Sequence, residues 1–531
     1  MTLNPVDGSG LQSRRAPAAA APGFRLPLHA LVMATLAALL AAGCALPGPA
    51  HTPLPLTAPA ALGLPATDTT DDALSPPQRW WTVLGDPQLD ALVERALQGS
   101  PGLDVTRARQ ARALALVETS RSASGLHGSL GLDATRQRYS ANGLVPPPIA
   151  GSTRTSANLQ ASLDWSPDFF GRNAAALAAS IGQARAAQAE SAAAAQTLAL
   201  QVSRAYVALA RLLAQRSVAE RLLAQRQSLL QLTQERTTAG LDSQVELTQA
   251  QAALPDARTQ IEALDEQIAL ARRLLAVLCG QAPEAQTALA PQLQNLALAA
   301  MPQQLGANLL GRRPDVAAAR WRVEAAAQDV AVARTGFYPD IHLGAFIGLN
   351  ALGLGNLVSA GSRQIGVAPA LRLPLFDGPR LRAQLAGSQA ELDTAIAQYN
   401  GAVLDAVKGA GDALASVQSI ERQQALQAEA ASKAEAAYDF ALQRYRAGLG
   451  NYLVVLNTES QVLVQRRARV DLLSRALDTR AVLLNALGGG WDDSARTPAG
   501  DLQSALATDP VAALRAPAAV PAAALLPAAP L

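Results

Sequence analysis

The residue best suited to chemistry is Cys44, which closes the segment Leu40-Ala41-Ala42-Gly43-Cys44. Small residues before a cysteine are what a bacterial lipoprotein signal peptidase requires, and the cysteine then takes a diacylglycerol group and an N-acyl chain. The apolar stretch Leu26 to Ala42 follows a basic region, as in a secretory signal. The sequence therefore predicts a signal peptide over 1–43 and lipidation of Cys44, whereas the segment is short for a transmembrane anchor. Ala45 in place of Asp at the next position predicts sorting to the outer membrane.

No catalytic or metal-binding pattern accompanies this cysteine. The histidines after it, His51, His127 and His342, have no metal-ligand spacing. Gly353-Leu-Gly355 is a fragment of a dinucleotide-binding motif, and no helix is expected after it. Cys279 is expected to be a small buried apolar residue. We therefore expect no enzyme activity, no metal and no cofactor other than the lipid on Cys44.

Composition and charge exclude a further class of function. Aromatic residues make up 4% of the chain and charged residues 16%, which suits long helices packed through small side chains. Removing 1–43 leaves 41 basic and 41 acidic residues. A neutral chain of this kind argues against binding to nucleic acid by charge.

The middle of the chain contains an internal repeat. Arg236-Thr-Thr-Ala-Gly240-Leu241 recurs as Arg444-Tyr-Arg-Ala-Gly448-Leu449, an offset of 208 residues. The same offset relates Arg172 to Arg380 and Gly280 to Gly488, so it extends over more than a hundred residues. A repeat of this length indicates a duplicated supersecondary unit.

Each unit is predicted to contain a helix, two strands and a long helical hairpin. No proline lies between Arg172 and Ala239, and the apolar residues of that stretch recur at helical spacing. Gly240 and Gly448 stand where a helix needs a left-handed terminator. Pro255 lies inside the returning helix and is expected to kink it or to remove a hydrogen bond.

Four segments alternate apolar and polar residues as β-strands do. Their apolar rows are Leu130 to Ala134, Leu159 to Trp165, Ile341 to Leu349 and Ile365 to Leu373. Strands of this length can cross a bilayer, although a soluble sheet with one buried face would show the same alternation. Four strands cannot close a membrane barrel, so several chains would have to share one.

Five regions follow from these patterns. They are the signal peptide 1–43, an extended tether 44–78, a first repeat 79–300, a second repeat 301–491, and a disordered Ala- and Pro-rich tail 492–531.

The chain resembles the TolC-like outer membrane factors, and among them the NodT-type lipoproteins of resistance–nodulation–division (RND) efflux systems. The segments that carry the resemblance are Trp80-Trp81 with Asp86-Pro87, Leu310 to Val316, Phe337 to Ile341, Leu373 to Gly378, and Ala486 to Trp491. The resemblance implies a mainly α-helical homotrimer, whose four strands per chain complete a 12-stranded barrel in the outer membrane above a periplasmic α-helical barrel. It also implies a periplasmic adaptor protein and an inner-membrane RND pump as partners, with passive export of small molecules such as drugs.

The turns of the two hairpins are the expected docking and gating end. We place adaptor docking at Gly240, Leu241, Ser243, Gly448, Leu449 and Asn451. The paired aspartates that close better-known members of the family are replaced here, so the gate candidates are Glu246, Gln249, Tyr445 and Asn457. Two alternatives stay open: an exit duct for a type I secretion system, and a periplasmic coiled-coil scaffold lipoprotein.

Overall fold

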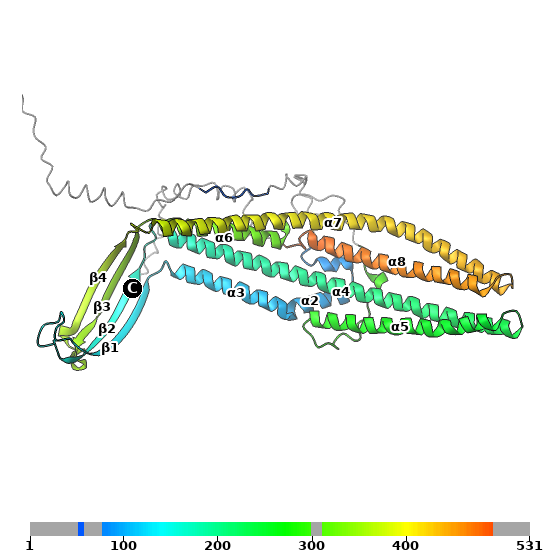
Figure 1. The fold of residues 1–531 in the computed structure, drawn as a ribbon, viewed down its shortest axis with the longest axis horizontal. Coiled ribbons are helices and arrows are strands. Elements are labelled where there is room, and N and C mark those ends of the chain that lie inside the picture. Colours follow the sequence, from blue (N-terminus) through cyan, green and yellow to red (C-terminus); the bar gives the residue numbers. More distant parts are fainter. Residues whose placement is uncertain (1–50, 58–76, 299–310, 492–531) are drawn as a thin grey trace, which may run out of the picture.

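A computed structural model describes residues 51–57, 77–298 and 311–491 of the chain. The predicted signal peptide, Cys44 and the predicted tail 492–531 lie outside these residues. The described chain is elongated, with a four-stranded sheet at one end and two hairpin turns at the other (Figure 1). Its helices and strands are η3 (Trp80–Leu84), α2 (Pro87–Gly99), α3 (Pro101–Ser122), β1 (His127–Arg138), β2 (Thr153–Trp165), α4 (Arg172–Thr238), α5 (Gln244–Leu278), η4 (Leu293–Asn295), α6 (Pro314–Thr335), β3 (Asp340–Leu352), η6 (Leu354–Asn356), η7 (Ala360–Ser362), β4 (Arg363–Arg372), α7 (Gly378–Arg446) and α8 (Tyr452–Ala486).

The predicted duplication is confirmed, because each half runs helix, two strands and helical hairpin. Helices α4 and α7 contain 67 and 69 residues, or about 100 Å each at 1.5 Å per residue. Helix α5 continues through Pro255 as one helix from Gln244 to Leu278.

The four hairpin helices end in the same way. Each ends with a glycine at positive φ, namely Gly240, Gly280, Gly448 and Gly488. At the first of these, Leu241 N donates to Arg236 O at 2.9 Å and Gly240 N donates to Thr237 O at 3.0 Å, which is the Schellman pattern. The corresponding pair of bonds closes the other three ends. The predicted terminators are thus confirmed, and they occur at the repeat offset.

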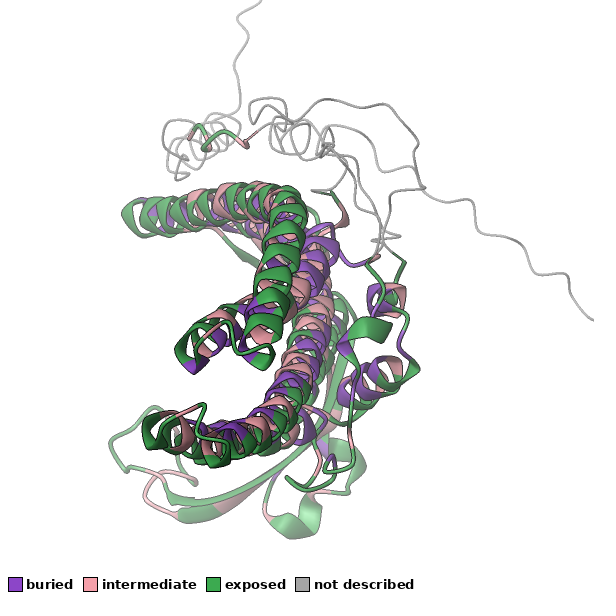
Figure 2. Ribbon diagram, turned by 90° about the vertical axis from the view of Figure 1, so that its right-hand side faces the viewer, coloured by how far each residue is buried: buried purple, intermediate pink, exposed green. Residues whose placement is uncertain are grey.

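The helices lie side by side in a curved layer. Helix α4 packs against α3, α5, α6 and α8, and α7 packs against α6 and α8. Along the molecule α3 is followed by α5, and α6 is followed by α8 (Figure 1). Together with α4 and α7, these two pairs of helices form four columns. Seen end-on, the columns follow an arc that does not close on itself (Figure 2). The column of α3 and α5 borders one side of this arc, and α7 borders the other.

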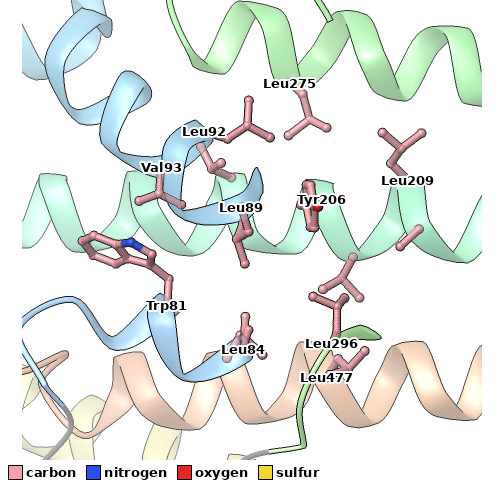
Figure 3. Close-up of a cluster of buried hydrophobic side chains, with 14 of the residues drawn as sticks. Trp81, Leu84, Leu89, Leu92, Val93, Tyr206, Leu209, Leu275, Leu296 and Leu477 are labelled. Atoms are coloured by element: carbon pink, nitrogen blue, oxygen red, sulfur yellow. The ribbon is translucent and has the colours of Figure 1, made fainter. Parts of the chain in front are cut away.

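A compact core lies where the columns meet the short N-terminal helices. Elements η3, α2, α4 and α5 contribute fully buried residues to it, including Trp80. Figure 3 labels four others: Leu84, Leu89, Tyr206 and Leu275. Asp86 caps α2 as predicted, since its Oδ1 accepts from Gln88 N at 2.9 Å. Elsewhere α4 buries many alanines, which lets its neighbours approach closely.

The sheet is antiparallel with strand order β1-β2-β3-β4. Its register places the predicted apolar rows on one face: Leu132 pairs with Leu159, Leu159 with Leu349, and Ile347 with Ile365. The opposite face carries mainly polar and small residues, such as Ser129, Ser162 and Gly366, with Phe346 between the last two. Both β1 and β4 are edge strands in the isolated chain.

Part of the predicted tether is held against α7. Leu54 N donates to Asp393 Oδ1 at 3.1 Å, and Thr57 N donates to Asn400 Oδ1 at 2.8 Å. His51 Nε2 lies 3.0 Å from Asp393 Oδ2. Residues 51–57 therefore run parallel to α7, with their N-terminal end toward the sheet. Among the described residues, no helix has the length and apolarity needed to cross a bilayer.

Candidate functional site at the hairpin tips

The two hairpin turns lie together at the end of the molecule farthest from the sheet (Figure 1). A hydrophobic cluster joins the hairpins beneath these turns. Its buried members come from α4, α5, α7 and α8 and include Leu229, Ala250, Tyr438, Tyr445, Tyr452 and Val455. The rings of Tyr445 and Tyr452 meet edge to face with centroids 6.1 Å apart.

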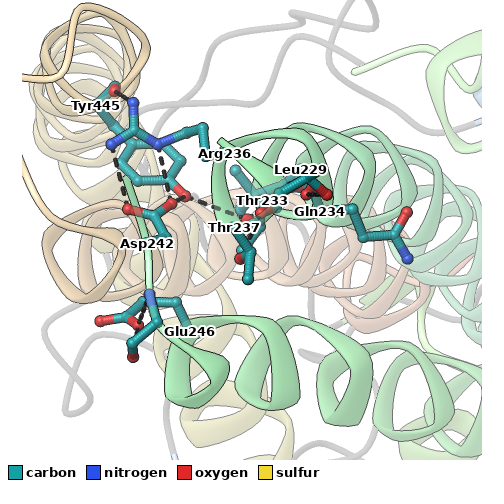
Figure 4. A network of polar contacts seen from close by, with 10 residues as sticks. Leu229, Thr233, Gln234, Arg236, Thr237, Asp242, Glu246 and Tyr445 are labelled. Atoms are coloured by element: carbon teal, nitrogen blue, oxygen red, sulfur yellow. Dashed lines mark hydrogen bonds and ion pairs between the residues drawn. The ribbon is translucent and has the colours of Figure 1, made fainter. Parts of the chain in front are cut away.

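A buried polar network connects the hairpins at the same level (Figure 4). Arg236 Nε and Nη2 donate to the two carboxylate oxygens of Asp242, at 2.9 and 3.2 Å. Arg236 Nη1 also donates to the backbone oxygen of Tyr445 at 3.0 Å, and the guanidinium carbon lies 4.5 Å from the centre of the Tyr445 ring. Tyr445 Oη donates to Asp242 Oδ2 at 2.5 Å. One arginine and one tyrosine from different hairpins therefore share a single carboxylate.

The electrostatics of this network favour the charged form of Asp242. Burial alone would raise the pKa of this carboxyl, but the hydrogen bonds from Arg236 and Tyr445 hold its pKa below the ordinary value. Burial and the bond to Asp242 raise the pKa of Tyr445, so its hydroxyl stays protonated and can donate. The link between the hairpins is thus a charge-assisted one.

A second polar contact joins the hairpins farther from the turns. Glu459 of α8 is 1% exposed, and its Oε2 lies 3.1 Å from Arg226 Nε of α4. Arg226 Nη1 donates to Ala253 O at 2.9 Å and lies 3.2 Å from Asp256 Oδ2, both on α5. Burial raises the pKa of Glu459, although Arg226 opposes this shift. This contact therefore holds a carboxylate that binds a proton more readily than an ordinary glutamate.

The predicted docking residues divide into two kinds. Leu241 and Leu449 are 65% and 71% exposed at the outermost points of the turns. Ser243 and Asn451 cap the helices that follow: Ser243 Oγ accepts from Val245 N at 3.1 Å, and Asn451 Oδ1 accepts from Val454 N at 3.1 Å. The two caps order the turns, and the two leucines are the side chains that the turns expose.

The predicted gate residues are not gathered into one cluster. Tyr445 is fully buried in the network described above. Glu246 instead accepts from the Ser243 hydroxyl and, at 2.9 Å, from Ser243 N in the capping box of α5, and these bonds lower its pKa. Gln249 and Asn457 are exposed on α5 and α8. Of the four candidates, Tyr445 is the one that the structure joins to the opposite hairpin.

The predicted site residues did not include Arg236, Asp242, Arg226 or Glu459. They also did not include Thr233, whose Oγ1 lies 3.2 Å from Tyr445 Oη. A usable signal was present in the repeat, at positions where the two halves differ in polarity. Asp242 is equivalent to Gly450, and Thr237 is equivalent to Tyr445. At these two positions the second hairpin supplies the hydroxyl of Tyr445 and the first hairpin supplies the carboxylate of Asp242 that accepts its hydrogen bond.

The described residues contain no cluster of histidine, cysteine or acidic side chains that could hold a metal ion. Cys279 is buried, as predicted, and burial raises the pKa of its thiol. His127 and His342 lie at the starts of β1 and β3.

Comparison with known proteins decides the family. Residues 92–281 and 305–489 match the model of the family described as outer membrane efflux protein. The chain belongs to the outer membrane efflux protein family. The multidrug resistance outer membrane protein MdtP of Escherichia coli K12 is 32% identical to this efflux protein over 431 residues, which cover 78% of this chain and 87% of MdtP. The protein MdtQ of Escherichia coli O157:H7 is 30% identical over 461 residues, which cover 85% and 96%.

Solved structures agree with this assignment. The outer membrane protein VceC of Vibrio cholerae is 34% identical and matches with a TM-score of 0.74, covering 78% of this chain and all of VceC. The CmeC outer membrane channel of Campylobacter jejuni is 17% identical and shares the fold with a TM-score of 0.75, covering 87% of this chain and 98% of CmeC. This efflux protein is therefore an outer-membrane channel component of an efflux system, with the mainly helical fold of TolC-like channels. The predicted outer membrane efflux family, mainly helical fold with a small sheet, function as an efflux channel and location in the outer membrane are confirmed.

Proposed function

We propose that this efflux protein works as a homotrimer whose three sheets close one barrel of twelve strands. The observation that carries the proposal is the register of the sheet, which gives one continuous apolar face and leaves β1 and β4 as open edges. An open edge is not tolerated in lipid, because its backbone groups would have no hydrogen-bond partners. Pairing β4 of one chain with β1 of the next removes every edge.

The helices support the same assembly. No other described helix covers the two sides of the arc of four columns, and three such arcs would complete a periplasmic tube of twelve columns under the twelve strands. Exposed apolar residues lie on both sides of the arc, such as Leu270, Leu274 and Val277 on α5 and Leu404 on α7. A neighbouring chain would bury them.

The polar face of the sheet would line the exit route. Gln364 Nε2 donates to Asn158 Oδ1 at 2.7 Å on that face, and the opposite, lipid-facing side carries a band of mainly apolar residues such as Leu159, Ile347 and Ile365. Small molecules, including drugs, would pass along the helical tube and this polar bore without reacting. An inner-membrane RND pump and a periplasmic adaptor protein would supply them.

The hairpin tips would dock the adaptor and close the channel. Leu241 and Leu449 offer the exposed apolar contacts, and Gly240 and Gly448 set the turns that present them. The network of Arg236, Asp242 and Tyr445 ties the two hairpins of each chain together, so breaking it would let one hairpin move away from the other. Asn457 and Gln249, exposed on the returning helices, are further candidates for the closed tip.

The lipid would act as an additional anchor. Acylation of Cys44 gives modest membrane affinity by itself, and the barrel supplies the rest.

Channel formation can be tested directly. Trimers purified in detergent and inserted into planar bilayers are expected to conduct ions, and chemical crosslinking is expected to stop at three chains. A water-soluble monomer without conductance would favour the scaffold alternative. Whether resistance to drugs or secretion of a protein is lost on deletion separates the RND partner from a type I secretion system.

A further inference from the structure

The apolar face of the sheet carries charges of a single sign. Arg136 and Arg138 of β1 share this face with Leu130 and Leu132, because alternate residues of a strand point the same way. Arg363 of β4 pairs with Leu349 and lines the same shallow depression as Leu159 and Ile365. The acidic residues of the described strands, Asp133, Asp164 and Asp340, lie on the opposite face.

These three arginines are also at one end of the sheet. Arg138 is the last residue of β1 and Arg363 is the first of β4, so both lie beside the loops farthest from the helices. The other end of the apolar face carries Trp165 and Leu371. From Ala157 to Trp165 the apolar band is about 30 Å long, measured along the strand at ~3.4 Å per residue. Because the strands of a membrane barrel are tilted, this length corresponds to a height close to that of the barrel's lipid-facing band.

The guanidinium groups are available for a ligand. All three arginines are exposed, and none has an ion pair or side-chain hydrogen bond within the described part of the chain. They also lie on the two edge strands. In the proposed trimer, on which this inference rests, β4 of one chain meets β1 of the next, so each seam would combine Arg363 with Arg136 and Arg138.

A phosphorylated lipid head group fits this arrangement. Guanidinium groups bind phosphate oxygens in pairs and keep their charge at any physiological pH. The helices lie in the periplasm, so the arginine end of the sheet faces the outside of the cell. There the outer leaflet is built of a glycolipid whose phosphates sit directly above its acyl chains. We propose that Arg136, Arg138 and Arg363 bind the phosphates of this glycolipid while the apolar band below contacts its acyl chains.

The test uses full-length trimers and two synthetic probes, bisphosphorylated lipid A and the same lipid without phosphates. The variant Arg136→Gln/Arg138→Gln/Arg363→Gln removes the three charges, and Arg363→Gln alone is the milder change. Arg154→Gln is the matched control, because Arg154 pairs with Gln137 on the polar face at the same end of the sheet. Bound lipid per trimer is counted by native mass spectrometry, and conductance is recorded from the same preparations.

We expect wild-type and Arg154→Gln trimers to retain the bisphosphorylated lipid in preference to the dephosphorylated one. Each basic residue beside an anionic membrane surface is worth roughly fivefold in binding, so the triple variant should retain the lipid about a hundredfold more weakly and Arg363→Gln about fivefold more weakly. Equal retention by the triple variant and wild type, or equal retention of the two lipids by wild type, would overturn the inference. If lipid retention fails in one of these two ways while conductance is normal, the inference is wrong and the proposed channel stands. If wild-type protein forms neither trimers nor channels, the proposed function is wrong.

Discussion

At the scale of single residues, Asp242 is where the contacts between the hairpins converge. Arg236 and Tyr445 both donate to this carboxylate, and its side chain is 8% exposed. Removing one partner of a buried ion pair costs on the order of 3 kcal/mol. If the closed tip depends on this contact, the ratio of closed to open channels falls by roughly a hundredfold.

We therefore predict that Asp242→Asn raises the open probability and the mean single-channel conductance in planar bilayers. Asp256→Asn is the matched control, because Asp256 also pairs with an arginine from α4 but is 60% exposed. Asn457→Ala is expected to widen the tip as well, by removing an exposed side chain. Wild-type currents from Asp242→Asn channels would show that the network has no part in closure.

The two buried carboxylates predict a dependence on pH. The pKa of Asp242 is lowered, so its contribution is fully present above about pH 4 and is lost as the pH falls through its folded value. Burial raises the pKa of Glu459, so its protonated form contributes stability to the folded chain at low pH, and this contribution is lost as the pH rises through the folded pKa.

Because Glu459 binds a proton more readily where it is buried, mild acid should favour the packed arrangement of the two hairpins, and the Arg236–Asp242 contact remains. We predict that lowering the pH from 7 to 5 decreases channel opening in the wild type. The variant Glu459→Gln should show the same opening at both values. A pH response of wild-type size in that variant would assign the effect to another group.

At the scale of the elements, the helix terminators differ in what surrounds them. A Cβ at Gly280 would lie 2.0 Å from Gly99 O, whereas a Cβ at Gly240 meets nothing within 4 Å. Both have positive φ, which costs an alanine about 1 kcal/mol. We predict that Gly280→Ala sharply lowers the yield and the dissociation temperature of detergent-stable trimers, and that Gly240→Ala lowers them slightly. Similar dissociation temperatures for the two variants would contradict the close approach at Gly280.

Substitutions in the turns are predicted to abolish adaptor docking without preventing trimer formation. Leu241→Glu or Leu449→Glu places a charge on an exposed apolar side chain at the tip, so adaptor docking and drug resistance should be lost while trimers still form. Leu144→Glu in the loop between β1 and β2 is the control at the opposite end, where Leu144 is fully exposed. Drug susceptibility and membrane trimers are measured together. Normal resistance in both tip variants would remove these leucines from the docking surface.

Elements of this fold were predictable because their signals are local. The helix predicted from Arg172 to Ala239 is observed from Arg172 to Thr238, since helical periodicity and the glycine terminator both lie within the segment. The apolar rows likewise predicted the strands. The tip network was not predicted, because its partners are 203 to 212 residues apart and chain packing alone brings Asp242 and Thr233 to Tyr445. Docking by Ser243 and Asn451 was inferred from position in the turns, where both residues also serve as caps.

At the scale of the whole molecule, anchoring can be separated from insertion. In the proposed channel the barrel holds the protein in the outer membrane, and the lipid on Cys44 is supplementary. We predict that Cys44→Ser protein, exported with a cleavable signal, still fractionates with membranes and resists extraction at high pH. Release of the whole protein into the soluble fraction would favour a scaffold held by its lipid.

The matching terminators of the two hairpins also bear on the symmetry of the assembly. The proposed trimer would contain six hairpins, three of each kind, and their shared lengths and terminators would give the tube an approximate sixfold axis. At the tips this equivalence ends, because Asp242 and Tyr445 stand opposite Gly450 and Thr237 in the repeat. Six equivalent hairpins could change the bore by moving together. With the equivalence broken at the tips, three hairpins can stay fixed and act as the frame against which the other three move.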